Sequence, residues 1–473
     1  MTTATEALRG IWELAAGDAR ALERVSLRGQ DPVLSSIFRV GAVAGASIAA
    51  SGLAASELWR LRTGQAESVD VDLRAAAAAF RSERYLRIAG ERPPRVWGPV
   101  AGYYPTDDGR WVQLHTNFPH HHAGMVELLD CDDTREAVAQ AIAGWQGQAL
   151  EDAIAERGLC GGLLRSGEQW GAHPQSQALA DLPVFEILPL AESDPLPLEP
   201  IDPAVDGGRP LDGVRVLDLT RVIAGPVCGR SLASHGAEVL RLCAPHLPTL
   251  PTVWLDMAQG KRAAWLDLRQ ADEREQLRGL IRDCDVFVQG YRPGTLATRG
   301  FGPGEVASLR PGVVYVSLSA YSHAGPWAER RGFDSLVQTV SGLGRAGAEA
   351  AGVEGTQPLP CQALDHASGY LAAMGAMIGL ARRAQQGGSW HVRVSLAQTG
   401  GWIWNLGRVE GGLDHPEQRL DDVRDLLIET QTEEGPTSTM GPPLTMLATP
   451  PRWDQPAVSL GTHAPRWRDQ ARD

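Results

Sequence analysis

Positive charge and long apolar runs are both scarce in this chain. Its 44 Lys and Arg residues are outnumbered by 57 Asp and Glu residues, which gives a formal net charge of -13. General binding to nucleic acid needs surplus basic residues gathered on one face, so no nucleic-acid partner is expected. No window approaches 18 uncharged apolar residues, and the N-terminus has no basic start followed by an apolar core. We therefore expect neither a membrane partner nor a signal peptide.

Cysteine is also rare, and its spacing does not suit metal binding. The six cysteines are scattered without a CxxC pair, which is typical of reduced thiols in a cytoplasmic protein. Four histidines gather at His115, His120, His121 and His122, but three adjacent rings cannot all face one side of a regular element. We expect loop or interface histidines there, no metal site and a cytoplasmic location.

Sequence motifs for nucleotide cofactors are missing as well, since neither GxGxxG nor GxxxxGK[ST] occurs. The chain is nevertheless 43% apolar and 473 residues long, enough for two or three compact units. After residue 210, short apolar strands alternate with helices, a pattern typical of an α/β fold with a parallel, doubly wound sheet. The predicted strands are 214–219, 238–242, 286–289 and 313–318, and the predicted helices are 226–235 and 272–282.

Two segments of the chain repeat one plan. Residues 39–75 and 363–398 each contain a small-residue helix with a basic end, a short linker and an alternating strand, at 68–73 and 391–396. The shared order of parts favours a duplicated or split module. Between the copies, residues 183–210 are rich in proline and acidic residues without a sustained period, which predicts an extended connector and a domain boundary.

The candidate site lies at the loops after Leu219, Gln289 and Ser319, because ligands of such a sheet bind at the carboxyl ends of its strands. The first loop, TRVIAGP, has a Gly-Pro pair that allows close backbone approach and a helix start with free amide donors. It could hold a phosphate, although a plain turn is the alternative. Lys261 and Arg262 could support a phosphate too, although a solvated basic pair is the commoner arrangement.

Several ordered blocks of the second half resemble family III CoA-transferases. These blocks are LDGVRVLDLTRVIAGPVCGRSLASHGAEVLRL, VFVQGYRPGTLATRGFG, RPGVVYVSLSAYSHAGPW, RRGFDSLVQ and QALDHASGYLAAMGAMIGLARR. The family includes formyl-CoA and carnitine CoA-transferases and the α-methylacyl-CoA racemases. The earlier blocks TGQAESVDVDL and YYPTDDGRWVQL are similar to the family's later portion, so the halves are reordered. We interpret the chain as a front-truncated copy fused to a copy without its small domain.

The resemblance implies a division into three parts and a homodimer. Residues 1–205 are a partial family copy of small-domain, α+β character, and residues 206–400 are a Rossmann-like domain that binds CoA and is catalytic. Residues 401–473 are a returning C-terminal segment. The implied partners are an acyl-CoA and a carboxylic acid. Coenzyme A is then a substrate, and no tightly bound cofactor is expected.

Asp365 aligns with the family's catalytic aspartate. The implied chemistry is covalent: the carboxylate attacks an acyl-CoA thioester, CoA leaves, and an aspartyl anhydride remains until an acceptor acid enters. Taken alone, an Asp that opens a helix is usually an N-cap. The equivalent place in the first copy falls near Ala42. One catalytic carboxylate is therefore expected in each chain.

Further residues are assigned to CoA binding by the resemblance. Arginines suit phosphate because they offer paired donors, while the alternatives are that Tyr291 is a packing aromatic and Arg331 a solvated charge. The sequence departs from the family pattern at Cys243, at the pair Gln289 and Gly290, and at a shifted arginine. The CoA-binding candidates are Arg221, Ala224, Tyr291, Arg292, Arg299 and Arg331.

Phe333 separates two activities of the family. Racemases carry a catalytic histidine where this chain has Phe333, because proton exchange at the α-carbon needs a base and an acid on opposite faces. Transferase is therefore favoured, with His366 as an unconventional second base in the alternative of a racemase or epimerase. A homologue that binds acyl-CoA without turnover is the other alternative.

Overall fold

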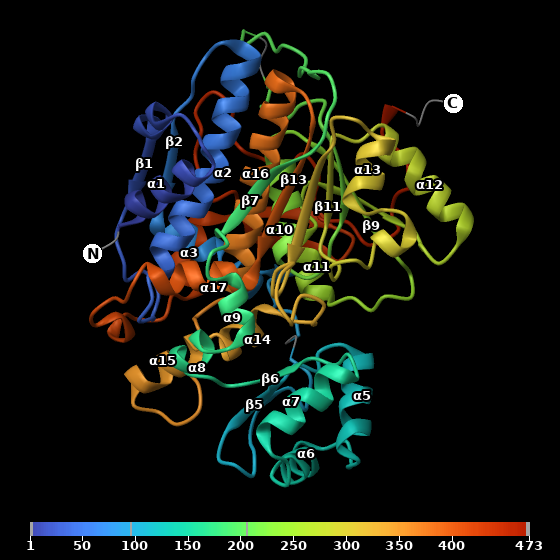
Figure 1. The fold of residues 1–473 in the computed structure, drawn as a ribbon. Coiled ribbons are helices and arrows are strands. Elements are labelled where there is room, and N and C mark those ends of the chain that lie inside the picture. The colour runs from blue at the N-terminus through green and yellow to red at the C-terminus, as the bar shows by residue number, and fades with distance from the viewer. Residues whose placement is uncertain (1–2, 95–96, 205–206, 470–473) are drawn as a thin grey trace.

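The computed structural model describes residues 3–94, 97–204 and 207–469, and its centre is a seven-stranded sheet in the order β10-β9-β8-β11-β12-β13-β7 (Figure 1). Neighbouring strands are parallel except for β7, which is antiparallel to β13. Counted from β8, the parallel strands lie in the order 3-2-1-4-5-6, so the direction of winding reverses between β8 and β11. The strands are β7 (Phe185–Ala191), β8 (Arg215–Leu219), β9 (Glu238–Cys243), β10 (Lys261–Trp265), β11 (Val286–Gln289), β12 (Val314–Ser319) and β13 (Ser389–Ser395).

The predicted strands and helices of this α/β part are confirmed, with ends that differ by a few residues at most. The prediction for residues 183–210 as an extended connector is wrong at its start, because β7 forms there. Phe185 of β7 is buried and pairs with Val394 of β13. Pro189 is tolerated because an edge strand needs no amide donor on its free side.

Helices cover both faces of the sheet (Figure 1). One face packs on α10 (Ala224–Ser234) and α16 (Ala363–Gln386), and the other packs on α12 (Ala271–Arg282) and α13 (Pro303–Leu309). A Cβ at Gly369 would lie 2.5 Å from the Ala224 carbonyl oxygen, so glycine permits the close crossing of α10 and α16. Further helices are α11 (Pro251–Met257), α14 (Asp334–Val340), α15 (Leu343–Ala351) and α17 (Leu396–Asn405).

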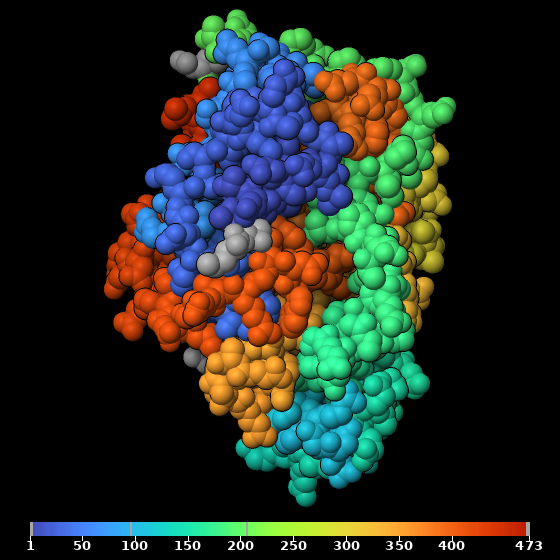
Figure 2. Space-filling view, turned by 60° about the vertical axis from the view of Figure 1, so that its left-hand side comes forward, coloured from blue at the N-terminus to red at the C-terminus, as the bar shows by residue number. Residues whose placement is uncertain are grey.

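The longest helix of the first half, α2 (Val40–Thr63), lies along α16, and the two segments are side by side in both views (Figure 1 and Figure 2). By length and composition alone α2 could cross a membrane, but 94% of its most apolar window is buried inside the protein. Ser51 on α2 also hydrogen-bonds Ser231 on α10 at 3.1 Å. The small-residue helix that the sequence predicts within residues 39–75 is therefore a buried helix of the core.

The two segments with a shared plan fold alike. β1 (Val25–Arg28) is parallel to β2 (Val69–Asp72), with α2 between them in the chain, as β12 is parallel to β13 with α16 between them. The Asp31 carboxylate accepts hydrogen bonds from the Gly41 and Ala42 amides at 2.8 and 2.9 Å. Asp334 likewise accepts from the Asp365 amide at 2.9 Å. The first copy thus keeps the capping carboxylate and has Ala42 at the position of Asp365.

A smaller lobe, residues 98–164, lies below the large sheet in Figure 1 and has its own apolar core. The C-terminal part adds a small sheet in which β15 (Gly435–Met440) pairs with β3 (Arg87–Ile88) from the first quarter of the chain. The lobe contains β4 (Gly102–Pro105), β5 (Trp111–Leu114), α5 (Pro119–Leu129), α6 (Arg135–Ile142), α7 (Gly147–Glu156) and β6 (Gly161–Leu163). The remaining elements are α1 (Ala4–Leu14), α3 (Leu73–Ala79), α4 (Ser82–Tyr85), β3 (Arg87–Ile88), α8 (Gly167–Gly171), α9 (Pro174–Leu179), β14 (Leu427–Thr432) and β15 (Gly435–Met440).

Candidate active site

Two cavities meet at Asp365. The first, of about 510 Å³, opens at the carboxyl ends of β8 and β11, where the winding of the sheet reverses. The second, of about 490 Å³, lies toward the segment that contains α4 and β3. Val222, Ile223, Phe333 and Asp365 border both cavities. A group held at Asp365 is therefore accessible from two sides.

Asp365 lies in the first turn of α16 but does not cap the helix. The N-cap residue is Gln362, whose side chain makes no capping hydrogen bond. The carboxylate of Asp334, at the start of α14, caps the helix instead, because it accepts a hydrogen bond from the Asp365 amide. Because another carboxylate does the capping, the Asp365 side chain borders the cavities, with only 8% of its surface exposed.

The surroundings of Asp365 disfavour its charged form. Burial raises the pKa of this carboxyl well above its ordinary value, and the nearby carboxylates of Asp334 and Glu83 raise it further. Burial also raises the pKa of Asp334 to about 7, against the effect of its hydrogen bonds from the Asp365 amide and from Gln338. The ionised Asp365 carboxylate is poorly solvated, which makes it a stronger nucleophile than the same group in water.

The loop after β8 is held in a strained conformation beside Asp365. Asp218 at the end of β8 accepts from the Thr220 amide at 2.9 Å and from its hydroxyl group. Two residues later Val222 has φ of 69°, a left-handed conformation that a β-branched residue rarely adopts. Backbone strain of this kind persists only where the surrounding structure holds the loop in place, and it clusters at active and ligand-binding sites. The loop thus presents Val222 and the start of α10 to the site in a fixed position.

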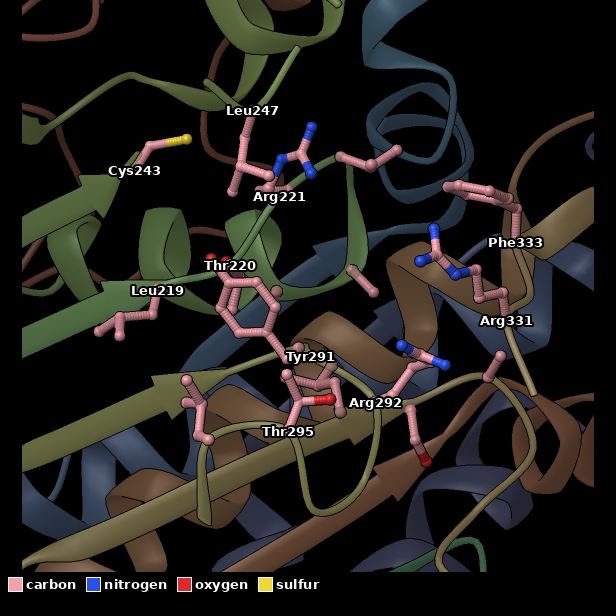
Figure 3. A pocket seen from close by; sticks show the side chains of 18 of the residues that line it. Leu219, Thr220, Arg221, Cys243, Leu247, Tyr291, Arg292, Thr295, Arg331 and Phe333 are labelled. Atoms are coloured by element: carbon pink, nitrogen blue, oxygen red, sulfur yellow. The ribbon is translucent and has the colours of Figure 1, made fainter. Parts of the chain in front are cut away.

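The catalytic and CoA-binding residues that the resemblance implies all border the first cavity. Figure 3 shows Arg221, Arg292 and Arg331 reaching into it from three different loops. Burial and Arg292 lower the pKa of Arg331, and its Nε is buried without a partner in the described part of the chain. Such a donor suits an anionic ligand. The assigned residues are Arg221, Ala224, Tyr291, Arg292, Arg299, Arg331 and Asp365.

The small lobe contributes residues to the site that the sequence did not predict. Phe118 stacks under the guanidinium of Arg221, with 5.3 Å between the charge centre and the ring centre. His121 accepts a hydrogen bond from Arg331 at 2.9 Å, which requires a neutral ring, and burial lowers the pKa of His121 to about 3. His120 and Cys160 border the same cavity. The histidine cluster was the available signal, but nothing local to it indicated which loops it would contact.

The prediction that Lys261 supports a phosphate or is solvated is wrong. Lys261 is the first residue of β10 and is 1% exposed, because its ammonium group pairs with Asp218 at 2.8 Å. Arg262 is also buried and pairs with Glu238 at 3.0 Å. Neither residue borders the cavities at Asp365.

Two histidines bear on the choice between transfer and racemisation. His115 stacks on Phe333 with ring centres 3.9 Å apart and borders the second cavity. Burial lowers the pKa of His115 to about 4, so its ring is neutral near pH 7. His366 is fully buried, stacks on Phe80 and borders neither cavity, so it has no access to a substrate there.

Comparisons with known proteins show which proteins this chain resembles. The model of CoA-transferase family III matches residues 22–182 and 211–419. An acyl-CoA transferase from Gibberella moniliformis is 32% identical over 323 residues, which are 64% of this chain and 56% of that protein. An acetyl-coenzyme A transferase from Hypoxylon pulicicidum is 30% identical over 324 residues, 64% of this chain and 54% of that protein.

The comparison with solved structures gives a similar range of identity. The orthorhombic crystal structure of Rv3272 from M. tuberculosis is 31% identical, covers 42% of this chain and 58% of that chain, and has a TM-score of 0.39. The chain spans little more than half the length of these two curated relatives.

Proposed function

This chain belongs to CoA-transferase family III, and we propose that it transfers CoA from an acyl-CoA thioester to a carboxylic acid through a covalent intermediate on Asp365. The observation that supports this most directly is the position of Asp365, a desolvated carboxyl at the junction of two cavities. A transfer between two acids needs a nucleophile that both can reach. In this proposal each chain has one such nucleophile, since Ala42 stands at the position of the first copy that is equivalent to Asp365.

CoA occupies the first cavity in this proposal. The strand order 3-2-1-4-5-6 supports a Rossmann-like sheet, in which ligands bind where the winding reverses. Arg221, Arg292 and Arg331 supply donors for the phosphates. The half-buried ring of Tyr291 offers an aromatic surface for the adenine. The thioester then lies near Asp365, with the acyl group directed toward the second cavity.

The reaction proceeds in three displacements that need no net proton transfer. An Asp365 carboxylate oxygen attacks the thioester carbon, the C–S bond breaks, and CoA leaves as the thiolate. The acceptor carboxylate attacks the aspartyl carbonyl carbon and releases the donor acid, which leaves a new mixed anhydride. The CoA thiolate then attacks the acceptor's carbonyl carbon, and the bond to Asp365 breaks. The products are the acceptor's CoA thioester and a restored Asp365 carboxylate.

Transfer is favoured over racemisation by the residues at the junction. Phe333 has no titratable group, and His366 has no access to either cavity. Proton exchange at an α-carbon needs two such groups on opposite faces of the substrate. Asp365 could serve as one of them, but Phe333 stands at the partner position, and His115, which stacks on Phe333, is a weak base because burial lowers its pKa to about 4.

The anhydride is tested by trapping it. The protein is incubated with acyl-CoAs of several chain lengths, quenched with hydroxylamine and digested for mass spectrometry. The expected result is a hydroxamate on the peptide that contains Asp365, absent from the Asp365→Ala variant. Measurable CoA binding without any adduct in the wild type would refute covalent transfer and leave the binding-only and racemase alternatives.

Arg331→Gln is expected to raise the KM for an acyl-CoA about 10–100-fold, the loss that follows removal of a hydrogen bond to a charged group. The kcat should change much less, since the phosphates lie far from the reacting carbon. Steady-state kinetics at two salt concentrations measure both quantities. Arg345→Gln, which removes an exposed arginine from α15, is the matched control. Equal KM values for the two variants would contradict the assignment.

Asp334→Asn is expected to move the acid limb of the pH profile of kcat/KM to lower pH. The charge of Asp334 is one cause of the raised pKa of Asp365, so its removal lowers the pH at which the nucleophile ionises. The asparagine oxygen can still accept the Asp365 amide. The variant should unfold at the wild-type temperature. If its acid limb then stays in place or moves to higher pH, the charge of Asp334 does not control the pKa of the nucleophile.

A further inference from the structure

The second cavity contains more positive charge than its own carboxylates neutralise. Five arginines border it, against Glu83 and Glu417 and the two carboxyls at the junction, Asp334 and Asp365. The pKa of each junction carboxyl is raised, so these groups contribute less negative charge near neutral pH. The five arginines are Arg81, Arg84, Arg87, Arg92 and Arg419.

The ion pairs of these arginines are unequal. Arg81 is 3% exposed and pairs with Glu417 at 2.5 Å, so its charge is satisfied. Arg84 reaches Glu83 and Glu417 only at 3.7 and 3.8 Å, well beyond the roughly 2.8 Å of a charge-assisted hydrogen bond. Arg87 donates to the carbonyls of Arg84 and Leu86 and forms no ion pair in the described part of the chain.

Arg87 is also under like-charge repulsion. Burial and the charges of Arg92 and Arg424 lower its pKa. Arg92 and Arg419 are exposed and lack ion pairs within the described ranges. Half-buried arginines without an anion are costly, and a bound carboxylate removes that cost by accepting two parallel hydrogen bonds.

Apolar side chains form the rest of the cavity wall. Trp97, Leu250 and Val253 border the second cavity together with Ile223 and Phe333 at the junction. A ligand in the second cavity thus meets a carboxyl nucleophile, a group of guanidinium ions and apolar side chains. An aliphatic acid with a second negative group matches this combination.

We propose that the second cavity selects dicarboxylic acids, with one carboxyl group reacting at Asp365 while Arg84 and Arg87 hold the other. This inference rests on the proposed function and specifies its substrate class. Arg84 and Arg87 act here as specificity-determining residues, since they contact the end of the substrate that does not react. A monocarboxylic acid of the same length would leave both guanidinium ions without an anion.

The test compares two donors that differ only at the far end, succinyl-CoA and butyryl-CoA. Release of the CoA thiol is followed with excess hydroxylamine present as the acceptor, and the rate of the Asp365→Asn variant is subtracted. We expect the wild type to have a higher kcat/KM for succinyl-CoA. In Arg87→Gln the ratio of the two kcat/KM values should fall about 10–100-fold, the effect of one hydrogen bond to a charged group.

Arg424→Gln is the matched control, because Arg424 lies near Arg87 but borders neither cavity. It should keep the wild-type ratio. A wild type without preference for succinyl-CoA would overturn the inference. An equal loss for both donors in Arg87→Gln would overturn it too, and would place the arginines at the CoA phosphates instead.

Failure of the proposed function has a different signature. If neither donor releases CoA, transfer on Asp365 is refuted, and calorimetric binding of both thioesters to the Asp365→Asn variant decides the inference separately. Tighter binding of succinyl-CoA that disappears when Arg87→Gln is added would support the dicarboxylate pocket. Equal binding of the two thioesters would overturn it.

Discussion

Asparagine at position 365 is expected to abolish CoA transfer while it stabilises the folded protein. Asp365→Asn removes the nucleophile but keeps the size of the side chain, so the loss in kcat should be on the order of 10⁴-fold or more. The buried carboxyl has a raised pKa in the folded state. The free energy of unfolding should therefore increase by on the order of 1 kcal/mol at neutral pH, as is common when a strained active-site group is removed.

The pH dependence of this stabilisation follows from the direction of the pKa shift. The unfolded Asp365 ionises at about pH 4, while the folded one holds its proton to higher pH. The wild type thus loses stability as pH rises from that value toward the folded pKa, and the asparagine variant does not. Urea midpoints at pH 4 and pH 8 should differ between the two proteins only at the higher pH. A variant that is less stable at pH 8 would show that the Asp365 charge is well solvated after all.

The sequence was sufficient to predict the strands of the large sheet, because each is a short apolar run between turn signals. The run at 286–289 coincides with β11. β7 was missed for a different reason. Its Pro-containing segment gains regular structure only by pairing with β13, about two hundred residues later in the chain. A local pattern cannot indicate a pairing that the tertiary fold imposes.

The candidate site likewise has one part that the sequence predicts and one part that it does not. Its first cavity was predictable from loops that follow parallel strands and from a resemblance carried by contiguous blocks. The contributions of His121 and Phe118 depend on how the small lobe docks on the sheet. The arginines of the second cavity come from residues 81–92 and from Arg419, and the fold alone brings these segments together. In the linear sequence these arginines cannot be distinguished from the charged residues of a solvated surface.

Lys261 shows most clearly what the sequence pattern cannot predict, because a lysine at the start of a strand is usually solvated. Here the chain buries its ammonium group between β8 and α10, where it donates to Asp218 and to the Pro226 carbonyl, each at 2.8 Å. Burial lowers the pKa of Lys261 to about 8. Burial alone would raise the pKa of Asp218, but the charges of Lys261 and Arg241 hold it below its ordinary value. The pair fixes the strand that leads into the strained loop beside Asp365.

Lys261→Met is accordingly expected to destabilise the protein by about 3–5 kcal/mol, because Asp218 would remain buried without its ion-pair partner. Urea denaturation at pH 7 measures the effect. Arg345→Gln, which breaks an exposed pair with Glu349, should cost less than about 1 kcal/mol. Adding Asp218→Asn to Lys261→Met should recover part of the loss, since the second change removes the unpaired charge. A loss no larger than that of Arg345→Gln would mean that water reaches Asp218 and that the pair does not hold the loop.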